Sequence, residues 1–152
     1  MTLHYVLNGR PAVADIRPDQ SLLEVLREAG CQSVRGGCET GSCGVCTLWV
    51  DEKPVLSCAY PAARAEGKRV TTVEGLPAEA EALTQALAAE GADQCGYCGP
   101  GFIMAALAML RELKNPTEEE IRRYMAGNLC RCTGYASRMR ALKKIIEGRA
   151  EI

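Results

Sequence analysis

The 152-residue sequence has few aromatic residues and a single histidine. Phe, Trp and Tyr make up 5% of the chain, with one Phe and one Trp. The histidine, His4, lies in a predicted strand, so a Ser/His/Asp or Cys/His catalytic arrangement has no suitably placed base. We therefore expect no substrate-converting residue on this chain, and we do not expect His4 to bind a metal.

Long apolar runs and a large net charge are also missing. The longest apolar run, 102–110, is too short to cross a bilayer, and the formal net charge is −1. We therefore expect no nucleic acid as a partner and no membrane insertion. Because the first residues lack a basic stretch followed by an apolar core, we expect a cytoplasmic protein.

Nucleotide-binding motifs are absent as well. No G-x-G-x-x-G follows a predicted strand, and no Lys-Ser/Thr follows the glycine-rich loop near residue 40, which excludes Rossmann and P-loop sites. The one asymmetry of charge is a basic stretch over 111–149, with 10 Lys/Arg and 5 Asp/Glu. This stretch predicts either a solvated helical face or a docking face for an acidic partner or an anionic cofactor.

Cysteine is abundant, with nine residues. An odd count without an export signal argues against a disulfide framework and favours thiols committed to metal. The stretch Gly36–Cys58 has the spacing C-x4-C-x2-C followed by a distant cysteine, which is the plant-type 2Fe-2S pattern. Its glycines allow the backbone to turn closely around an inorganic core. A structural zinc site or a disulfide staple is the less favoured alternative. The candidate ligands are Cys38, Cys43, Cys46 and Cys58.

A second set of cysteines has the form C-x2-C followed much later by C-x-C. Both pairs lie at predicted helix ends, where two junctions can meet at one point. An iron–sulfur site is favoured, because C-x-C is tighter than the usual zinc spacing, but a four-cysteine zinc site and a redox dithiol stay open. The residues are Cys95, Cys98, Cys130 and Cys132. The ninth cysteine, Cys31, belongs to neither set and is predicted to be a buried structural thiol.

The first half of the chain predicts a small α+β unit, residues 1–75. It consists of a hairpin turning at Asn8-Gly9, a helix with a capping box at Ser21 and Glu24, and the cysteine loop. A second hairpin follows, with strands 47–51 and 54–57, a turn at Glu52-Lys53 and Trp49 packed within it. A last strand spans 69–73.

The second half, residues 76–152, predicts an all-α unit of four helices. The first helix lies between Leu76 and Gly91, and the second opens at Gly99-Pro100-Gly101 and is apolar around most of its surface. The third starts at a Thr117/Glu120 capping box, and the fourth spans 136–147. The predicted fold class is α+β, with an all-α region after the sheet.

Four segments of the sequence together resemble the small iron–sulfur subunit of the molybdenum hydroxylases. This is the family of xanthine dehydrogenase, aldehyde oxidoreductase and isoquinoline oxidoreductase. The resemblance covers almost the whole chain. It rests on the segments 38–47 (CETGSCGVCT), 94–101 (QCGYCGPG), 115–117 (NPT) and 127–135 (GNLCRCTGY). It implies two 2Fe-2S clusters, one in a β-grasp ferredoxin-like domain and one in a four-helix domain.

The resemblance also implies roles for single residues. Cys38, Cys43, Cys46 and Cys58 would ligate the outer cluster, and Cys95, Cys98, Cys130 and Cys132 the inner one. Gln94 and Cys132 match positions that approach the pterin in similar proteins, and a glutamine amide can both donate to and accept from a pterin edge. The sequence departs from the family pattern at Gly99, where threonine is usual, and after Tyr135, where Ala-Ser-Arg-Met-Arg140 replaces an apolar start of the last helix.

The function predicted from this resemblance is electron transfer inside a larger oxidoreductase. Electrons would come from the molybdopterin cofactor of a large partner subunit and leave through a FAD subunit or a cytochrome acceptor. Arg131, between two ligands, should favour the reduced state. A free-standing two-cluster carrier and a zinc-stapled interaction module are the rival hypotheses. The substrate site would lie on the partner, with purines, aldehydes, N-heteroaromatics and carbon monoxide as candidate substrates.

Overall fold

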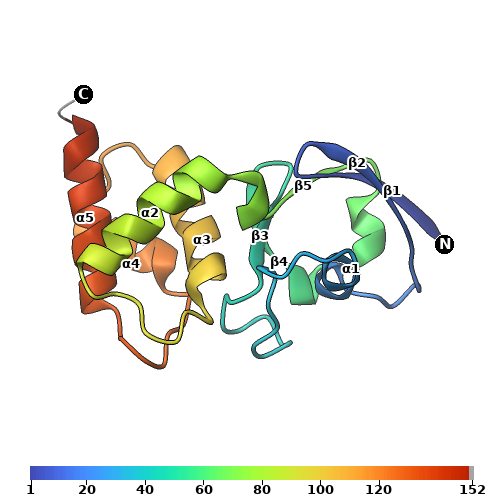
Figure 1. Ribbon diagram of the computed structural model, residues 1–152, viewed down its shortest axis with the longest axis horizontal. Coiled ribbons are helices and arrows are strands. Elements are labelled where there is room, and N and C mark those ends of the chain that lie inside the picture. Colours follow the sequence, from blue (N-terminus) through green and yellow to red (C-terminus); the bar gives the residue numbers. More distant parts are fainter. Residues whose placement is uncertain (151–152) are drawn as a thin grey trace.

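The computed structural model describes residues 1–150 and has two lobes arranged end to end (Figure 1). One lobe contains all five strands and the short helix α1 (Leu22–Glu28), and the other contains four longer helices. The architecture is therefore α+β, a mixed sheet with five α-helices among the described residues. The N-terminus lies at the end of the sheet lobe away from the helices, and helix α5 lies at the opposite end of the molecule.

The sheet is built from two hairpins joined by one central strand. Its order is β2-β1-β5-β3-β4, and only the β1–β5 pair is parallel. The predicted first hairpin is confirmed, because both Asn8 and Gly9 have positive φ between the two strands. The strands are β1 (Thr2–Leu7), β2 (Arg10–Asp15), β3 (Thr47–Val50), β4 (Lys53–Leu56) and β5 (Arg69–Thr71).

Two details of the second hairpin were predicted wrongly. The turn lies at Asp51-Glu52, both with positive φ, one residue before the predicted turn, because two left-handed residues match the twist of the flanking strands. The Trp49 ring packs outside its hairpin, in the helical core, and its Nε1 donates to the carbonyl oxygen of Met104 at 2.9 Å. Strand β5 is also shorter than predicted and leads into a 3-10 turn, Val73–Gly75.

The helices begin where their capping residues predict. Ser21 and Thr117 each accept from the backbone N–H three residues on, and Glu24 and Glu120 accept in return from the capping residue, so both capping boxes are confirmed. Gly30 ends the first helical segment with φ +87°. The helices of the second lobe are α2 (Pro77–Ala89), α3 (Gly99–Glu112), α4 (Glu118–Met125) and α5 (Ala136–Ala150).

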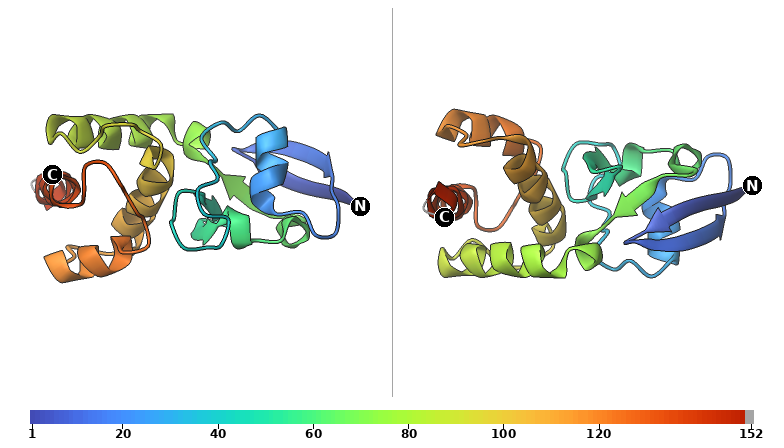
Figure 2. Two further views of the ribbon diagram at one scale, coloured as in Figure 1. Left: turned by 90° about the horizontal axis from the view of Figure 1, so that it is seen from below. Right: turned by 90° about the horizontal axis from the view of Figure 1, so that it is seen from above.

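Helix α3 is the centre of the second lobe. Its residues from Gly101 to Leu110 are all buried, which confirms the predicted central apolar helix. Helices α2, α4 and α5 surround it, and its remaining side faces β3 of the sheet lobe (Figure 2). The two cores therefore meet through Trp49. No helix within residues 1–150 combines the length and apolar character that crossing a membrane requires.

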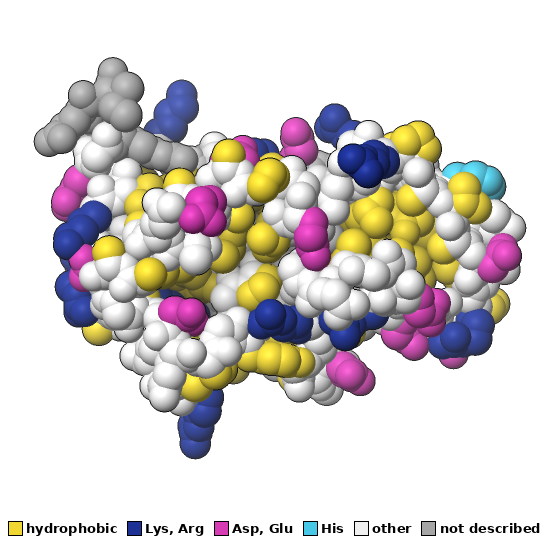
Figure 3. All heavy atoms as spheres, viewed as in Figure 1, with side chains coloured by type: hydrophobic (Ala, Val, Ile, Leu, Met, Phe, Trp, Pro, Cys, Tyr) yellow, Lys and Arg dark blue, Asp and Glu magenta, His cyan; other side chains and the backbone are white. Residues whose placement is uncertain are grey.

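The basic stretch 111–149 lies largely on helix surfaces, where glutamates neutralise part of it. Figure 3 shows Lys and Arg side chains next to acidic ones at the edge of the molecule formed by α5. Glu90 contacts two cations of α5, and Glu118 contacts one cation of α5 and one of its own helix. These ion pairs link α5 to the end of α2 and to the start of α4. This pairing favours the solvated helical face over a docking surface. The paired cations are Arg111, Arg122, Arg123, Arg140, Lys143 and Lys144.

Candidate metal centres

The first cysteine group is assembled by one loop and one hairpin. Cys38, Cys43 and Cys46 lie on the loop between α1 and β3, and Cys58 lies in a 3-10 turn directly after β4. Because β3 and β4 are antiparallel, the start of β3 and the end of β4 lie side by side, which brings Cys58 to Cys46. Ser57 fixes this junction, since its hydroxyl donates to the carbonyl oxygen of Cys46 at 2.9 Å.

The loop directs backbone N–H groups at a sulfur. The N–H groups of Thr40 and Ser42 lie 3.4 and 3.3 Å from Sγ of Cys38. Hydrogen bonds from Thr40, and then from the backbone of Ser42 and Cys43, lower the pKa of Cys38 to about 5. At neutral pH this cysteine is therefore a thiolate, the form that binds metal. Hydrogen bonds of this kind to sulfur also tune a bound iron–sulfur cluster.

Cys58 differs from Cys38 because it is partly buried beside other thiols. Burial, followed by the hydrogen bond and charge of Cys46, raises the pKa of Cys58 to about 11. The Cys58 thiol therefore lies in contact with Cys46. A bound metal cation would offset the cost of ionising these thiols, because it replaces the protons of both.

Two glycines allow the loop to close on its surroundings. A Cβ on Gly37 would lie 2.9 Å from Sγ of Cys43, so a side chain there would displace a candidate ligand. Gly44 has φ +73°, and its Cβ would lie 2.4 Å from the carbonyl oxygen of Gly127 in the other lobe. Only glycine meets both demands at position 44.

The second cysteine group is assembled from two helix junctions. Cys95 and Cys98 precede α3, and Cys130 and Cys132 follow α4. All four line one cavity of about 340 Å³, together with Val45 of the sheet lobe. The backbone N–H of Tyr97 and then the neighbouring Cys132 thiol lower the pKa of Cys95, and the Cys95 thiol raises the pKa of Cys132, so segments far apart in sequence do meet.

The second group has both backbone and side-chain donors. The N–H of Tyr97 lies 3.5 Å from Sγ of Cys95. The Thr133 hydroxyl lies 3.3 Å from Sγ of Cys130, and an Nη of Arg138 donates to Sγ of Cys98 at 2.9 Å. Burial raises the pKa of Cys130, but the hydrogen bonds from Thr133 and Cys132 and the charge of Arg138 outweigh it and lower that pKa to about 6. This thiol therefore also ionises at neutral pH.

Direct hydrogen bonds join the two cysteine groups. The N–H of Leu129, next to Cys130, donates to the carbonyl oxygen of Cys43 at 2.9 Å. The amide of Asn128, which is 8% exposed, donates to the carbonyl oxygens of Gly44 at 3.1 Å and Gly101 at 3.3 Å. One short bridge thus runs from a cysteine of the first group to a cysteine of the second.

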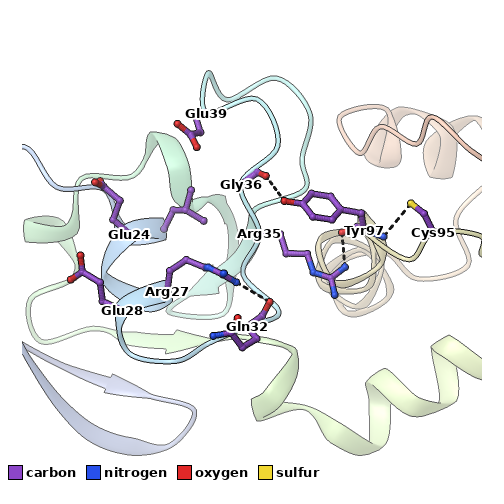
Figure 4. Close-up of a pocket in the computed structure, with 10 residues that line it drawn as sticks. Glu24, Arg27, Glu28, Gln32, Arg35, Gly36, Glu39, Cys95 and Tyr97 are labelled. Atoms are coloured by element: carbon purple, nitrogen blue, oxygen red, sulfur yellow. Dashed lines mark hydrogen bonds between the residues drawn. The ribbon is translucent and has the colours of Figure 1, made fainter.

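Arg35 and Tyr97 form a second bridge between the groups (Figure 4). The Tyr97 hydroxyl donates to the carbonyl oxygen of Gly36 at 2.7 Å, at the start of the first cysteine loop. Arg35 reaches the other way, because its Nη1 donates to the carbonyl oxygens of Gly96 and Tyr97 at 2.6 and 3.0 Å. Both residues line a cleft between α1 and the Cys95 loop. The two bridges hold the cysteine loops in one fixed relation.

The remaining predicted residues have simpler surroundings. Gln94 and Cys132, the candidate pterin contacts, are both exposed. Cys31 is buried in the core of the sheet lobe, and burial raises its pKa, as expected for a structural thiol. His4 lies on an exposed strand position beside Glu66.

Sequence reasoning missed four residues that shape these sites. They are Arg35, Tyr97, Asn128 and Arg138. Asn128 lies inside a quoted motif, and Arg138 lies in the stretch that departs from the family pattern, so both carried a signal. Tyr97 carried the same signal, because it lies in the segment 94–101, whereas Arg35 lies outside every family segment and had none.

The two sites fit a two-iron cluster. Such a cluster needs two thiolates at each iron, and the structure brings thiols together as Cys46 with Cys58 and Cys95 with Cys132. Within residues 1–150, no group of three or more His, Cys, Asp or Glu side chains converges closely enough to hold a single metal ion.

Comparison with known proteins defines the class of this chain. Residues 5–72 match the family described as a 2Fe-2S iron-sulfur cluster binding domain, and residues 72–143 match a 2Fe-2S binding domain. The chain is thus an iron–sulfur protein with two cluster-binding regions.

Relatives narrow the class to one family. The xanthine dehydrogenase iron-sulfur-binding subunit of Escherichia coli O157:H7 is 48% identical over 142 residues, which is 89% of this chain and 87% of the relative. The crystal structure of quinoline 2-oxidoreductase from Pseudomonas putida 86 has a chain with TM-score 0.90 and 38% identity, covering 99% of this chain and 94% of that one.

The aldehyde oxidoreductase of Desulfovibrio desulfuricans has a TM-score of 0.87 and 37% identity, and here the match covers 97% of this chain but 17% of the other. In that protein the same fold is thus part of a much longer chain. The chain belongs to the family of iron–sulfur subunits of the molybdenum hydroxylases, and its function is electron transfer.

Proposed function

We propose that this chain conducts electrons from a molybdopterin-containing partner subunit to an acceptor, either a FAD subunit or a cytochrome. Cys38, Cys43, Cys46 and Cys58 would hold the outer 2Fe-2S cluster, and Cys95, Cys98, Cys130 and Cys132 the inner one. When bound, each cluster supplies one-electron redox chemistry. The hydrogen bond from Leu129 to Cys43 carries the proposal, because it links a ligand of one site to the neighbour of a ligand of the other.

The chain itself supplies the protein side of this function. The glycine-rich loop directs backbone N–H groups at Cys38, while Thr133 and Arg138 reach the sulfurs of the second group. Asn128 and Tyr97 hold the two loops together, so the ligands move little when charge arrives. Small reorganisation of this kind favours fast electron transfer.

We also propose a division of the chain into residues 1–75, a β-grasp ferredoxin-like domain, and 76–152, a four-helix domain. The two hydrophobic cores support this division. Gln94 and Cys132, exposed beside the inner site, are the proposed pterin contacts. A reducing, cytoplasmic location is proposed because none of the nine cysteines forms a disulfide and eight of them are proposed metal ligands.

Metal analysis and purification of the native protein test this function. We expect two irons and two sulfides for each of two clusters, visible absorption, and co-purification with a molybdopterin-containing partner. A colourless protein with zinc and no iron would overturn electron transfer. A monomer with full redox function would instead establish a free-standing carrier.

A further inference from the structure

Arg138 is a buried cation with an unusual shortage of partners. Its side chain is 4% exposed, and its Nε and Nη1 atoms have no hydrogen-bond partner among the described residues. The guanidinium contacts the Phe102 ring, 4.4 Å from the centroid, and donates one hydrogen bond, to Sγ of Cys98. Buried charges are costly unless they are paired, so this arrangement needs a compensating negative charge.

The position of Arg138 in its helix adds to the cost. Helix α5 starts at Ala136, so Arg138 lies in the first turn, where the helix dipole disfavours a positive charge. Other cations of α5 have a carboxylate partner, as Arg140 has in Glu90. No carboxylate pairs with Arg138 among the described residues. The negative charge that it faces must come from the cysteine sulfurs.

We propose that Arg138 is a positioning residue that raises the reduction potential of the inner cluster, through its charge and its N–H···S bond to Cys98. This inference rests on the proposed function, because it requires a cluster on the second cysteine group. One-electron reduction adds one negative charge to the cluster and breaks no bond, and the electron comes from the molybdopterin-containing partner. A buried positive charge at a ligand sulfur stabilises the more negative, reduced form.

Burial makes this effect large compared with that of an exposed arginine. Water and salt screen exposed charges strongly, whereas a guanidinium removed from water acts at a lower effective dielectric. A hydrogen bond in which one partner is charged is also about twice as strong as a neutral one. The same reasoning predicts little effect on the outer cluster, because the hydrogen bond of Arg138 goes to Cys98 of the second group and its ring contact to Phe102 of α3.

The test is an EPR-monitored redox titration of the purified native complex, comparing wild type with R138M, R138Q and R138K. Methionine keeps the length and apolar contact but removes charge and donor. For R138M we expect at least a tenfold loss in the equilibrium constant of inner-cluster reduction, about 59 mV downward for a one-electron couple. R138Q should lose nearly as much. R138K, which keeps the charge, should recover more than half of the shift on a logarithmic scale.

The control is R140M, which removes a charge from the next turn of the same helix, where the side chain is exposed and paired with Glu90. For this variant we expect the equilibrium constant of inner-cluster reduction to change less than twofold. In every variant we expect the equilibrium constant of outer-cluster reduction to change less than twofold. The proposal would be overturned if the equilibrium constant of inner-cluster reduction in R138M or R138Q lay within twofold of the wild-type value. Equal shifts of both clusters would overturn it as well.

Two further outcomes are distinguishable from these. If R138M fails to assemble the inner cluster, R138K and R138Q decide, because the proposal requires them to differ in potential. If the wild-type complex shows no second 2Fe-2S signal, the proposed function itself fails, whatever residue occupies position 138.

Discussion

The two cysteine groups hold chemically similar sites but differ in how the chain builds them. The first is almost local, with three cysteines on one loop and the fourth returned by a hairpin. The second draws on two helix junctions separated by all of α3 and α4. A local loop can direct its own backbone N–H groups at sulfur. The helix junctions also direct backbone N–H groups at sulfur, as Tyr97 does at Cys95, and they add the charged side chain of Arg138 at Cys98.

This difference teaches that the two sites depend on different parts of the fold. The first group depends on glycine conformations within its loop, and the second depends on helix packing around α3. The contact between the groups, at Gly44, Asn128 and Leu129, couples the two requirements.

The largest effect should come from removing one ligand of each group. We expect Cys43→Ser to abolish one 2Fe-2S EPR signal and Cys130→Ser to abolish the other, each leaving its counterpart in place. Serine oxygen is a poor substitute for thiolate at iron. Cys31→Ala, which removes a buried thiol outside both groups, should leave both signals. Loss of the same signal in both serine variants would contradict the separation of the two sites.

The contact between the groups should be the next most sensitive feature. Gly44→Ala places a Cβ against the Gly127 carbonyl oxygen and also strains a positive φ, so we expect a loss of about 3 kcal/mol in the free energy of unfolding. Gly67→Ala is the matched control, since it has φ +68° with nothing within 4 Å, and should cost about 1 kcal/mol. Denaturant unfolding measures both. Equal losses would show that crowding against the second lobe contributes nothing.

Removing the amide of Asn128 should weaken the same contact by a smaller amount. Asn128→Ala leaves two buried carbonyl oxygens, those of Gly44 and Gly101, without this donor, at a cost of about 2 kcal/mol. Asn128→Asp should destabilise more, because a carboxylate repels both oxygens. If the aspartate variant were as stable as wild type, the amide could not be the donor that joins the lobes.

The helix caps should show the two regions behaving alike. Ser21→Ala at α1 and Thr117→Ala at α4 each remove a capping-box hydroxyl, so we expect about 1 kcal/mol from either by thermal or denaturant unfolding. Neither change should shift a cluster potential. If a cap variant did shift a cluster potential, the local stability of its helix would influence the metal sites.

The smallest effect should be the acid dependence of these caps. Hydrogen bonds from the backbone and side chain of Ser21 lower the pKa of Glu24, and those of Thr117 lower the pKa of Glu120. A lowered folded-state pKa means that the stabilisation is complete above the unfolded value and disappears as the pH falls through the folded one. Glu24→Gln and Glu120→Gln should each flatten the decline in unfolding temperature below about pH 4.5. If both variants kept the wild-type decline in unfolding temperature, the caps would not be the cause of that decline.

Local patterns in the sequence determined most of the elements. The capping boxes, the Asn8-Gly9 turn and the apolar segment of α3 each depend on residues within a few positions of one another, and all were predicted correctly. The turn of the second hairpin was misplaced by one residue, because two successive positive φ values at Asp51 and Glu52 are not signalled by glycine or asparagine.

The sequence by itself determined the two cysteine sets and the family, because ligand spacing is a local property that survives in any packing. Tertiary structure decided how the sets relate to each other. Only folding brings the Leu129 N–H to Cys43, Tyr97 to Gly36, Trp49 to α3 and Arg138 to Cys98. These contacts join residues 40 or more positions apart, and no periodicity or spacing encodes such a distance. The physical reason is that such contacts form only when helices, loops and hydrophobic cores that are separate in the sequence pack together.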